Sequence, residues 1–172
     1  FTDRRQRQMC IRDSMQGVLN IKKAPPDEGF EFVLAGRSNA GKSSALNCLT
    51  KNKKLARTSK MPGRTTEVNF FKVNDEIKLV DLPGYGFSKM SIDKKKNLDI
   101  LLDNYFSSRQ SLCAAIIFMD IRHPLKDSDI QMMEFCNRHG VPFISVLTKS
   151  DKLNSSAIAK STKSVEKKLN SQ

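Results

Sequence analysis

Eight consecutive residues in the first third of the chain have types that could bind a polyphosphate: Gly36, Arg37, Ser38, Asn39, Ala40, Gly41, Lys42 and Ser43. They follow the pattern G-x-x-x-x-G-K-[ST], in which two glycines let the backbone turn tightly and point its N–H groups inward. Lys42 would supply a positive charge to the β- and γ-phosphates, and the Ser43 hydroxyl could bind Mg²⁺. A glycine-rich turn without a ligand is the alternative. The apolar run 30–35 before the loop and the helix-like segment 44–49 after it favour the phosphate site.

A second short motif follows the predicted strand 77–80. It has the form D-x-x-G and consists of Asp81, Leu82, Pro83 and Gly84. Asp81 could reach Mg²⁺ through a water molecule, and the Gly84 N–H could sense a γ-phosphate. Taken alone, these four residues would be read as a turn at the end of a strand. Beside a phosphate loop they predict the other side of a nucleotide triphosphate site.

A third motif narrows the choice of base. It matches [NT]-K-x-D and consists of Thr148, Lys149, Ser150 and Asp151. The Asp151 carboxylate could accept hydrogen bonds from the N1–H and the 2-amino group of guanine, a donor pair that adenine lacks. The aliphatic stem of Lys149 could cover the face of the base. The sequence therefore favours GTP over ATP, and Asp151 argues against an ATP-dependent kinase.

Hydrophobic patterns indicate how these loops are positioned. A short edge strand is expected at 16–23, a strand hairpin at 67–73 and 77–80, and buried strands at 30–35, 112–120 and 142–147. Helices are expected at 93–110, with Leu98, Leu101, Leu102, Tyr105 and Phe106 on one side; at 126–139, with Ile130, Met133 and Cys136 or Asn137 inward and Gly140 as the stop; and at 155–170. The alternation predicts an α/β fold with three layers and a mostly parallel sheet. The ligand crevice should lie at the carboxyl ends of the strands.

Composition limits the classes of protein to consider. The 172 residues suffice for one domain with a core, and no apolar run approaches the length that spans a bilayer. Four cysteines lack a metal-binding spacing and are read as reduced thiols, which fits a cytoplasmic protein. The net charge of +12 favours a polyanionic partner such as RNA, and a solvated lysine-rich surface is the alternative. Nothing in the sequence demands more than a monomer.

The chain resembles the EngB (YihA) family of bacterial GTPases, within the Era-like translation-factor class of P-loop GTPases. The segments that carry the resemblance are GRSNAGKSSALN from Gly36, LARTSKMPGRT from Leu55, LVDLPGYGF from Leu79, MDIRHPLKDSD from Met119 and LTKSDKL from Leu147. The resemblance implies GTP and GDP as ligands with Mg²⁺, a role in assembling the large ribosomal subunit, and a need for the protein in cell division and septation.

The resemblance also assigns roles in the long loop before residue 67. It implies that Thr65 binds Mg²⁺ and assists catalysis together with Lys42, with Thr66 the weaker candidate for the metal. It further implies nucleotide contacts from the residues around Thr65, which are Gly63, Arg64, Thr66 and Glu67. A hydroxyl in this loop could complete the Mg²⁺ shell when GTP is bound.

Two positions bear on the rate of hydrolysis. Many signalling GTPases carry a water-orienting glutamine immediately after D-x-x-G, where this chain has Tyr85. We therefore expect slow intrinsic hydrolysis that relies on Mg²⁺, Lys42 and backbone donors. Asn39 resembles the asparagine that binds K⁺ in related potassium-activated GTPases. Its alternative role is to shape the loop through side-chain hydrogen bonds, and the sequence leaves both open. A pure GTP- or GDP-binding module without turnover is a further alternative.

The two ends of the chain differ from the rest of it. Residues 1–14 resemble translated adapter sequence and are set aside as a non-native segment, with a disordered basic tail as the alternative. Residues 15–172 are expected to form a G domain of the EngB type that lacks its last strand and last helix. A sheet without that strand would expose an apolar edge.

Overall fold

A single mixed sheet forms the centre of the molecule in the computed structural model, which describes residues 13–49, 67–85 and 91–170, with side chains from Gly17 onward. Its strands are β1 (Asp13–Val18), β2 (Phe30–Gly36), β3 (Val68–Lys72), β4 (Ile77–Asp81), β5 (Leu112–Asp120) and β6 (Phe143–Thr148). Their spatial order is β1-β3-β4-β2-β5-β6. β2 pairs in parallel with β4 and β5, and β5 pairs in parallel with β6, whereas β3 is antiparallel to β1 and β4. The prediction of a mostly parallel sheet is confirmed.

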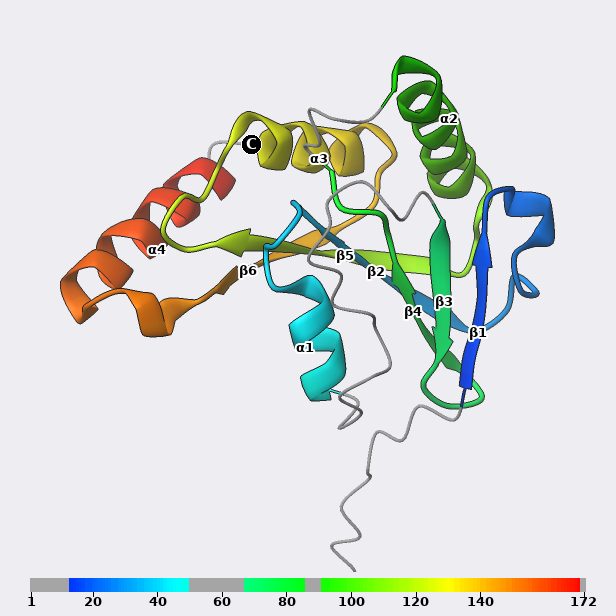
Figure 1. The fold of residues 1–172 in the computed structure, drawn as a ribbon, viewed down its shortest axis with the longest axis horizontal. Coiled ribbons are helices and arrows are strands. Elements are labelled where there is room, and N and C mark those ends of the chain that lie inside the picture. The colour runs from blue at the N-terminus through cyan, green and yellow to red at the C-terminus, as the bar shows by residue number, and fades with distance from the viewer. Residues whose placement is uncertain (1–12, 50–66, 86–90, 171–172) are drawn as a thin grey trace, which may run out of the picture.

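Helices cover both faces of this sheet. They are α1 (Lys42–Leu49), α2 (Ile92–Ser108), α3 (Asp127–Arg138) and α4 (Ser155–Leu169), with short 3₁₀ turns η1 (Ile21–Lys23) and η2 (Ser150–Lys152). Figure 1 shows α1 on one side of the sheet and α2 and α3 on the other, which gives the three predicted layers. Residues of β2 face the two layers alternately, because Val33 and Ala35 pack in the cluster with α2 and α3 while Leu34 packs with α1. This explains the continuous apolar run in β2.

The face of α2 was predicted correctly, and the face of α3 only in part. All five residues expected on the inner side of α2 are buried. In α3 the buried side chains are Met132, Met133 and Cys136, together with Asp129, whereas Ile130 is half-buried. The inner stripe of α3 is therefore rotated from the expected one, since adjacent Met132 and Met133 both pack inward.

The two edges of the sheet are β1 and β6. The segment of β6 was predicted as a buried strand with no strand after it, and among the described residues it is an edge strand whose Ile144 is 59% exposed, in agreement with the apolar edge that was expected. Phe143 and Leu147 of β6 pack with the cluster of α2 and α3, and Val146 packs with the cluster of α1. β1 lies at the opposite edge as expected, although it spans Asp13–Val18, so Asp13 and Ser14 of the segment set aside belong to a paired strand.

One acidic side chain is buried at the beginning of β2. Glu31 is 0% exposed and accepts hydrogen bonds from the Tyr105 hydroxyl, at 2.8 Å, and from the Arg109 guanidinium. The Lys78 ammonium lies 3.8 Å from the same carboxylate. Burial, and then the neighbouring Glu31, raise the pKa of Tyr105. A buried charge needs such partners, and this network fastens the start of β2 at the end opposite to the phosphate loop.

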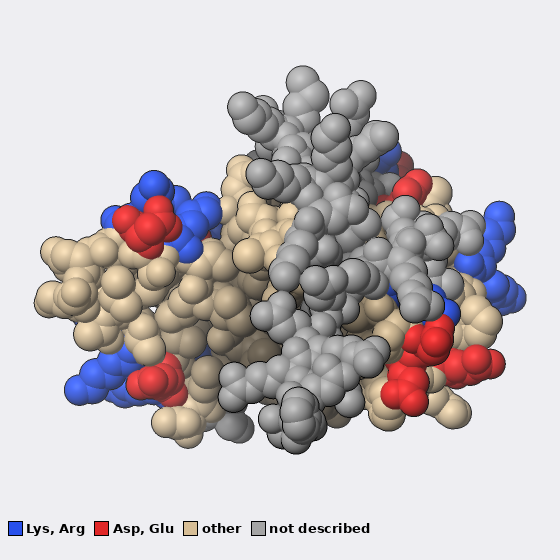
Figure 2. Space-filling view, turned by 90° about the horizontal axis from the view of Figure 1, so that it is seen from below, with Lys and Arg blue, Asp and Glu red and all other residues tan. Residues whose placement is uncertain are grey.

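The charges on the surface are mixed. Figure 2 shows Lys and Arg next to Asp and Glu at both ends of the face that carries α1, so the described part of that face has no continuous patch of one sign. Within residues 13–49, 67–85 and 91–170, no helix combines the length and the apolar character needed to cross a membrane.

Candidate nucleotide site

The phosphate-loop segment leaves the carboxyl end of β2 and enters α1, as the sequence predicted. Gly41 has a φ of 90°, a conformation that glycine adopts readily, and Asn39 has a φ of 62°, where asparagine is one of the better tolerated residues. Gly36 is needed for a different reason, because a Cβ atom there would lie 2.9 Å from the carbonyl oxygen of Phe118 on β5. The Ala40 N–H donates to the Arg37 carbonyl at 3.0 Å and closes the turn.

The lysine and the aspartate expected to serve phosphate and metal are in direct contact. Lys42 is the first residue of α1, Asp81 is the last residue of β4, and the Lys42 ammonium donates to the Asp81 carboxylate. Their side chains are only 10% and 13% exposed. Burial raises the pKa of Asp81, and the charge of Lys42 opposes that shift. Ser43 follows on the same helix and is half-buried. A phosphate-binding cation and a hard carboxylate oxygen therefore share one place at the carboxyl edge of the sheet.

The segment after β4 is attached to the phosphate loop through its backbone. The Tyr85 N–H donates to the Gly36 carbonyl and the Ser38 N–H donates to the Tyr85 carbonyl, both at 3.4 Å. Leu82 and Pro83 are buried beneath this contact, and Gly84 is half-buried. The first and second predicted motifs thus lie side by side.

The side chain of Tyr85 turns toward α3. Its hydroxyl donates to the Asp129 carboxylate at 3.2 Å, and Asp129 also accepts from the Lys126 N–H at 3.1 Å. Burial, followed by the nearby Asp129, raises the pKa of Tyr85. Sequence reasoning did not anticipate Asp129, because nothing in the pattern of α3 distinguishes this acid from an exposed residue of the first helical turn.

The third motif is bonded to the phosphate loop. The Thr148 hydroxyl lies 2.6 Å from the Ala40 carbonyl oxygen and 3.1 Å from that of Met119. The Lys149 ammonium donates to the Asn39 carbonyl at 2.6 Å. Two segments that are about 110 residues apart in the chain therefore meet at the carboxyl ends of β2 and β6.

Asp151 lies just beyond this attachment, in η2. Its side chain is 67% exposed and accepts from the Lys152 ammonium at 2.9 Å. That hydrogen bond holds the pKa of Asp151 below its ordinary value, so the carboxylate is ionised at neutral pH. Ser150 beside it is exposed. An ionised carboxylate close to a phosphate loop could accept hydrogen bonds from a base.

The comparisons with known proteins agree with this arrangement. The family described as 50S ribosome-binding GTPase matches residues 31–149. A probable GTP-binding protein EngB from Stenotrophomonas maltophilia is 50% identical over 152 residues, which is 88% of this chain and 76% of the relative. The chain belongs to the EngB family of GTP-binding proteins. A second EngB relative, from Mannheimia succiniciproducens, is 49% identical over 90% of this chain and 76% of its own length.

Solved structures support the fold. A probable GTP-binding protein engB superimposes with a TM-score of 0.65 at 22% identity, covering 81% of this chain and 80% of its own. Era from Aquifex aeolicus, bound to GDP and an aluminium fluoride, superimposes with a TM-score of 0.59 at 19% identity, covering 82% of this chain and 48% of its own. The EngB family and the G-domain fold expected from the sequence are therefore confirmed. The chain is a guanine-nucleotide-binding protein of a GTPase family.

Of the residues predicted from the loop before β3 of this EngB-family chain, only Glu67 is described. Gly63, Arg64, Thr65 and Thr66 lie outside the described residues. Glu67 is exposed just before β3, and a Cβ atom at Gly17 of β1 would lie 2.3 Å from its carboxylate oxygen. Glu67 thus faces β1, which is three strands away from β2 in the sheet.

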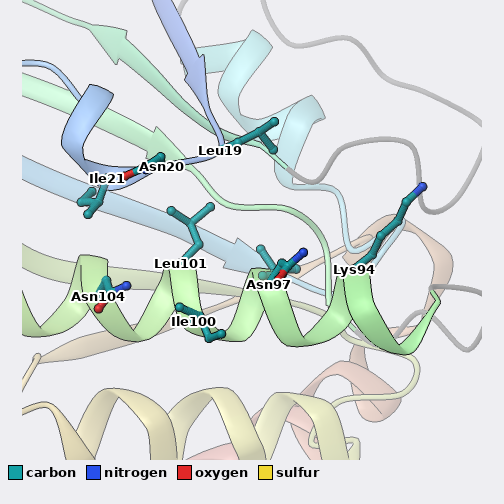
Figure 3. Close-up of a pocket in the computed structure, with 9 residues that line it drawn as sticks. Leu19, Asn20, Ile21, Lys94, Asn97, Ile100, Leu101 and Asn104 are labelled. Carbon is teal, nitrogen blue, oxygen red and sulfur yellow. The ribbon is translucent and has the colours of Figure 1, made fainter.

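A pocket of about 380 Å³ lies elsewhere in this EngB-family chain, between α2 and the link from β1 to η1. Figure 3 shows Leu19 and Ile21 on one side of it and Ile100 and Leu101 of α2 on the other. None of the predicted nucleotide-site residues lines it. This pocket and the nucleotide motifs are therefore separate parts of the molecule.

Proposed function

We propose that this chain binds GTP in the site described above and hydrolyses it slowly. The exchange between the GTP-bound and GDP-bound forms would then act as a switch in assembly of the large ribosomal subunit. The observation that carries the proposal is the bonding of Thr148 and Lys149 to the phosphate-loop carbonyls of Ala40 and Asn39. A purine triphosphate needs a base site and a phosphate site at a fixed separation, and these hydrogen bonds supply that connection.

Each group then has a chemical task. The backbone of the phosphate loop and Lys42 hold the phosphates, and the α1 dipole adds positive potential at the same place. Asp151 accepts hydrogen bonds from the guanine N1–H and 2-amino groups, and the stem of Lys149 covers the base. The order of residues 51–66 would follow the γ-phosphate, as in other switch loops.

The donor set fits Mg²⁺. Magnesium binds few protein oxygens and keeps water and phosphate oxygens in the rest of its octahedron. The Ser43 hydroxyl and the Asp81 carboxylate, the latter through water, are donors of this kind, and Thr65 would add a third. When bound, the ion would neutralise charge on the β- and γ-oxygens.

The position of Tyr85 supports slow hydrolysis. Its hydroxyl donates to Asp129, and a phenol cannot orient a water molecule as a carboxamide does. Lys42 and backbone N–H groups remain to stabilise the transition state. Hydrolysis in single-turnover assays, with and without large-subunit precursor particles, tests this; no turnover in either would mean a pure binding module.

A potassium ion at Asn39 is a further part of the proposal. The Asn39 side chain is exposed on the phosphate loop, so it would lie close to bound phosphates, where K⁺ could supply charge in place of an arginine finger. The competing role is conformational, since Asn39 adopts a φ of 62°. Faster hydrolysis in KCl than in NaCl supports the ion; equal rates eliminate it.

The partner we propose is a precursor of the large ribosomal subunit, which a monomer of this chain binds in the cytoplasm. Cell division and septation would depend on the chain because they require newly assembled ribosomes. The net charge of +12 favours contact with rRNA. Cosedimentation of the chain with precursor particles in GTP against GDP tests the partner. The proposal would be contradicted if the same amount of the chain sedimented with and without particles and that amount did not change with salt concentration.

Nucleotide selectivity is the decisive test of the site. Asp151→Asn exchanges the carboxylate for an amide, whose N–H can donate to the second carbonyl of xanthine, so we expect GTP binding to weaken and XTP binding to appear. Asp99→Asn, on the exposed surface of α2, is the matched control and should bind GTP as the unmodified chain does. Unchanged GTP selectivity in Asp151→Asn would refute the guanine assignment.

A further inference from the structure

Asp120 is a charged residue at the carboxyl edge of the sheet, where the nucleotide motifs lie. It is the last residue of β5, and its Cα is the register partner of Thr148 on β6. Its side chain is only 14% exposed. The parallel pairing places it beside the first residue that follows β6, which is Lys149.

The Asp120 carboxylate holds two cations. One oxygen accepts from the Lys149 ammonium at 2.9 Å and from the Arg122 guanidinium at 2.6 Å. The other accepts from the Arg122 Nε at 2.9 Å and from the Arg122 backbone N–H at 3.1 Å. Lys149 is therefore held between a carboxylate from β5 and the Asn39 carbonyl of the phosphate loop.

We propose that Asp120 is a positioning residue of the guanine site, which acts by fixing the side chain of Lys149 before the nucleotide arrives. The inference deepens the proposed function and rests on the base-covering role given there to Lys149. Asp120 itself need not touch the nucleotide.

The physical reason is pre-organisation. A lysine has a long stem with several freely rotating bonds, and each side chain of this kind that is immobilised on binding costs affinity. Two of the three ammonium N–H groups of Lys149 already have acceptors, so most of that cost is met in the fold. Lys149 also has a φ of 61°, an unfavourable conformation for a residue with a side chain, and the same two contacts help to stabilise it.

Arg122 keeps the carboxylate charged. Its hydrogen bonds, with a further contribution from Lys149, lower the pKa of Asp120 well below the ordinary value of 3.8. Arg122 is 42% exposed, hydrogen-bonds to Asp120, and its charge also helps to lower the pKa of Asp151. A substitution at Arg122 would therefore act on both acidic residues, so Arg122 is not a neutral control for Lys149.

The inference makes a specific prediction about selectivity. Lys149 covers the face of the base, whereas Asp151 reads its edge. Loss of Asp120 should therefore weaken GTP, GDP and ITP by a common factor, roughly 3- to 10-fold for one side chain that must now be ordered on binding. The preference for GTP over ITP, which lacks the 2-amino group, should not change.

The experiment is a double-mutant cycle on the full chain with fluorescent nucleotide displacement. The variants are Asp120→Ala, Lys149→Ala and the double variant, with Asp120→Asn as the conservative change and Asp99→Asn, on the exposed surface of α2, as the control. We expect the double variant to bind no more weakly than Lys149→Ala, because Asp120 has nothing left to position. Asp120→Asn, which keeps an acceptor oxygen, should lose less affinity than Asp120→Ala, and Asp99→Asn should stay within about twofold of the unmodified chain.

Two results would overturn the inference. One is strictly additive losses in the cycle, and the other is a changed GTP-to-ITP ratio, which would indicate general loosening of residues 148–152. Asp120→Asn provides the same readout in a variant that preserves side-chain shape. If Lys149→Ala itself binds GTP normally, the proposed role of Lys149 fails; if only the Asp120 variants bind normally, the proposed role stands and this inference alone fails.

Discussion

Replacing Thr148 by valine isolates the connection between the base motif and the phosphate loop. Valine has nearly the shape of threonine but no hydroxyl, so the methyl group that faces Gly41 is retained; a Cβ atom at Gly41 would lie 3.3 Å from it. What is lost is the donor to the Ala40 carbonyl at 2.6 Å. The second carbonyl, on Met119 at 3.1 Å, competes for the same proton, so the substitution removes one hydrogen bond rather than two.

The magnitude follows from burial. Ala40 is 2% exposed, so its carbonyl loses a donor where water has little access. Leaving a buried acceptor without its partner costs about 1–3 kcal/mol of unfolding free energy. For a chain of this length each kcal/mol lowers Tm by about 2–4 °C. Part of the same free energy should appear in nucleotide binding, where 1.4 kcal/mol corresponds to about a tenfold change in Kd.

The assay compares Thr148→Val with Thr148→Ser, which keeps the hydroxyl and loses only the methyl group. Urea denaturation measures unfolding free energy, and displacement of a fluorescent GDP measures Kd. We expect the valine variant to be the less stable and the weaker binder. The reasoning is refuted if the two variants unfold at the same urea concentration and bind GDP equally, or if the serine variant is the weaker of the two.

Three further outcomes follow from the contacts described. Glu31→Gln removes the buried carboxylate between Lys78 and Arg109, of which Arg109 keeps one acidic partner, Asp27 at 3.6 Å, and should cost about 3–5 kcal/mol of unfolding free energy in urea denaturation. Exposed Glu28→Gln should cost almost nothing, and equal stabilities would contradict the network. Tyr85→Phe removes the donor to Asp129 and should leave single-turnover hydrolysis within about twofold; a large loss would mean that the phenol takes part in the chemistry. The pKa of Asp120 is depressed in the folded chain, so its stabilisation is complete above the unfolded value near 3.8 and is lost as pH falls below about 4. The stability difference between the unmodified chain and Asp120→Asn, measured by urea denaturation across that range, should therefore shrink with falling pH, and a constant difference would refute it.

Local patterns predicted the elements of the fold well. The inner face of α2 and the apolar strands β2 and β5 were anticipated because helical and extended chains repeat their side-chain directions at fixed intervals. α3 was predicted less well, since Met132 and Met133 are adjacent and both are buried, which a simple stripe does not allow. β6 has the composition of a central strand but is an edge strand in the described structure. Composition alone does not encode that position, which was anticipated only from the resemblance to a family with one more strand.

The partners of charged side chains were not predicted. Glu31 lies in a run that reads as purely apolar, and its partner Arg109 is 78 residues away. The Asp129 carboxylate that receives the Tyr85 hydroxyl and the Asp120 carboxylate that holds Lys149 were likewise absent from the expected site. Each of these pairs forms only because the sheet order brings distant segments together.

The sequence alone determined the family, the order of the strands and helices along the chain, and the three loops that a guanine nucleotide would need. These depend on residue type and spacing within a few residues, which local backbone geometry converts directly into structure. Only the tertiary structure decided that Lys42 contacts Asp81, that Thr148 and Lys149 bind the phosphate-loop carbonyls, and that Asp120 stands beside them. Such contacts join residues through the pairing of parallel strands, and the free energy that selects one pairing over another comes from the whole core rather than from any one segment.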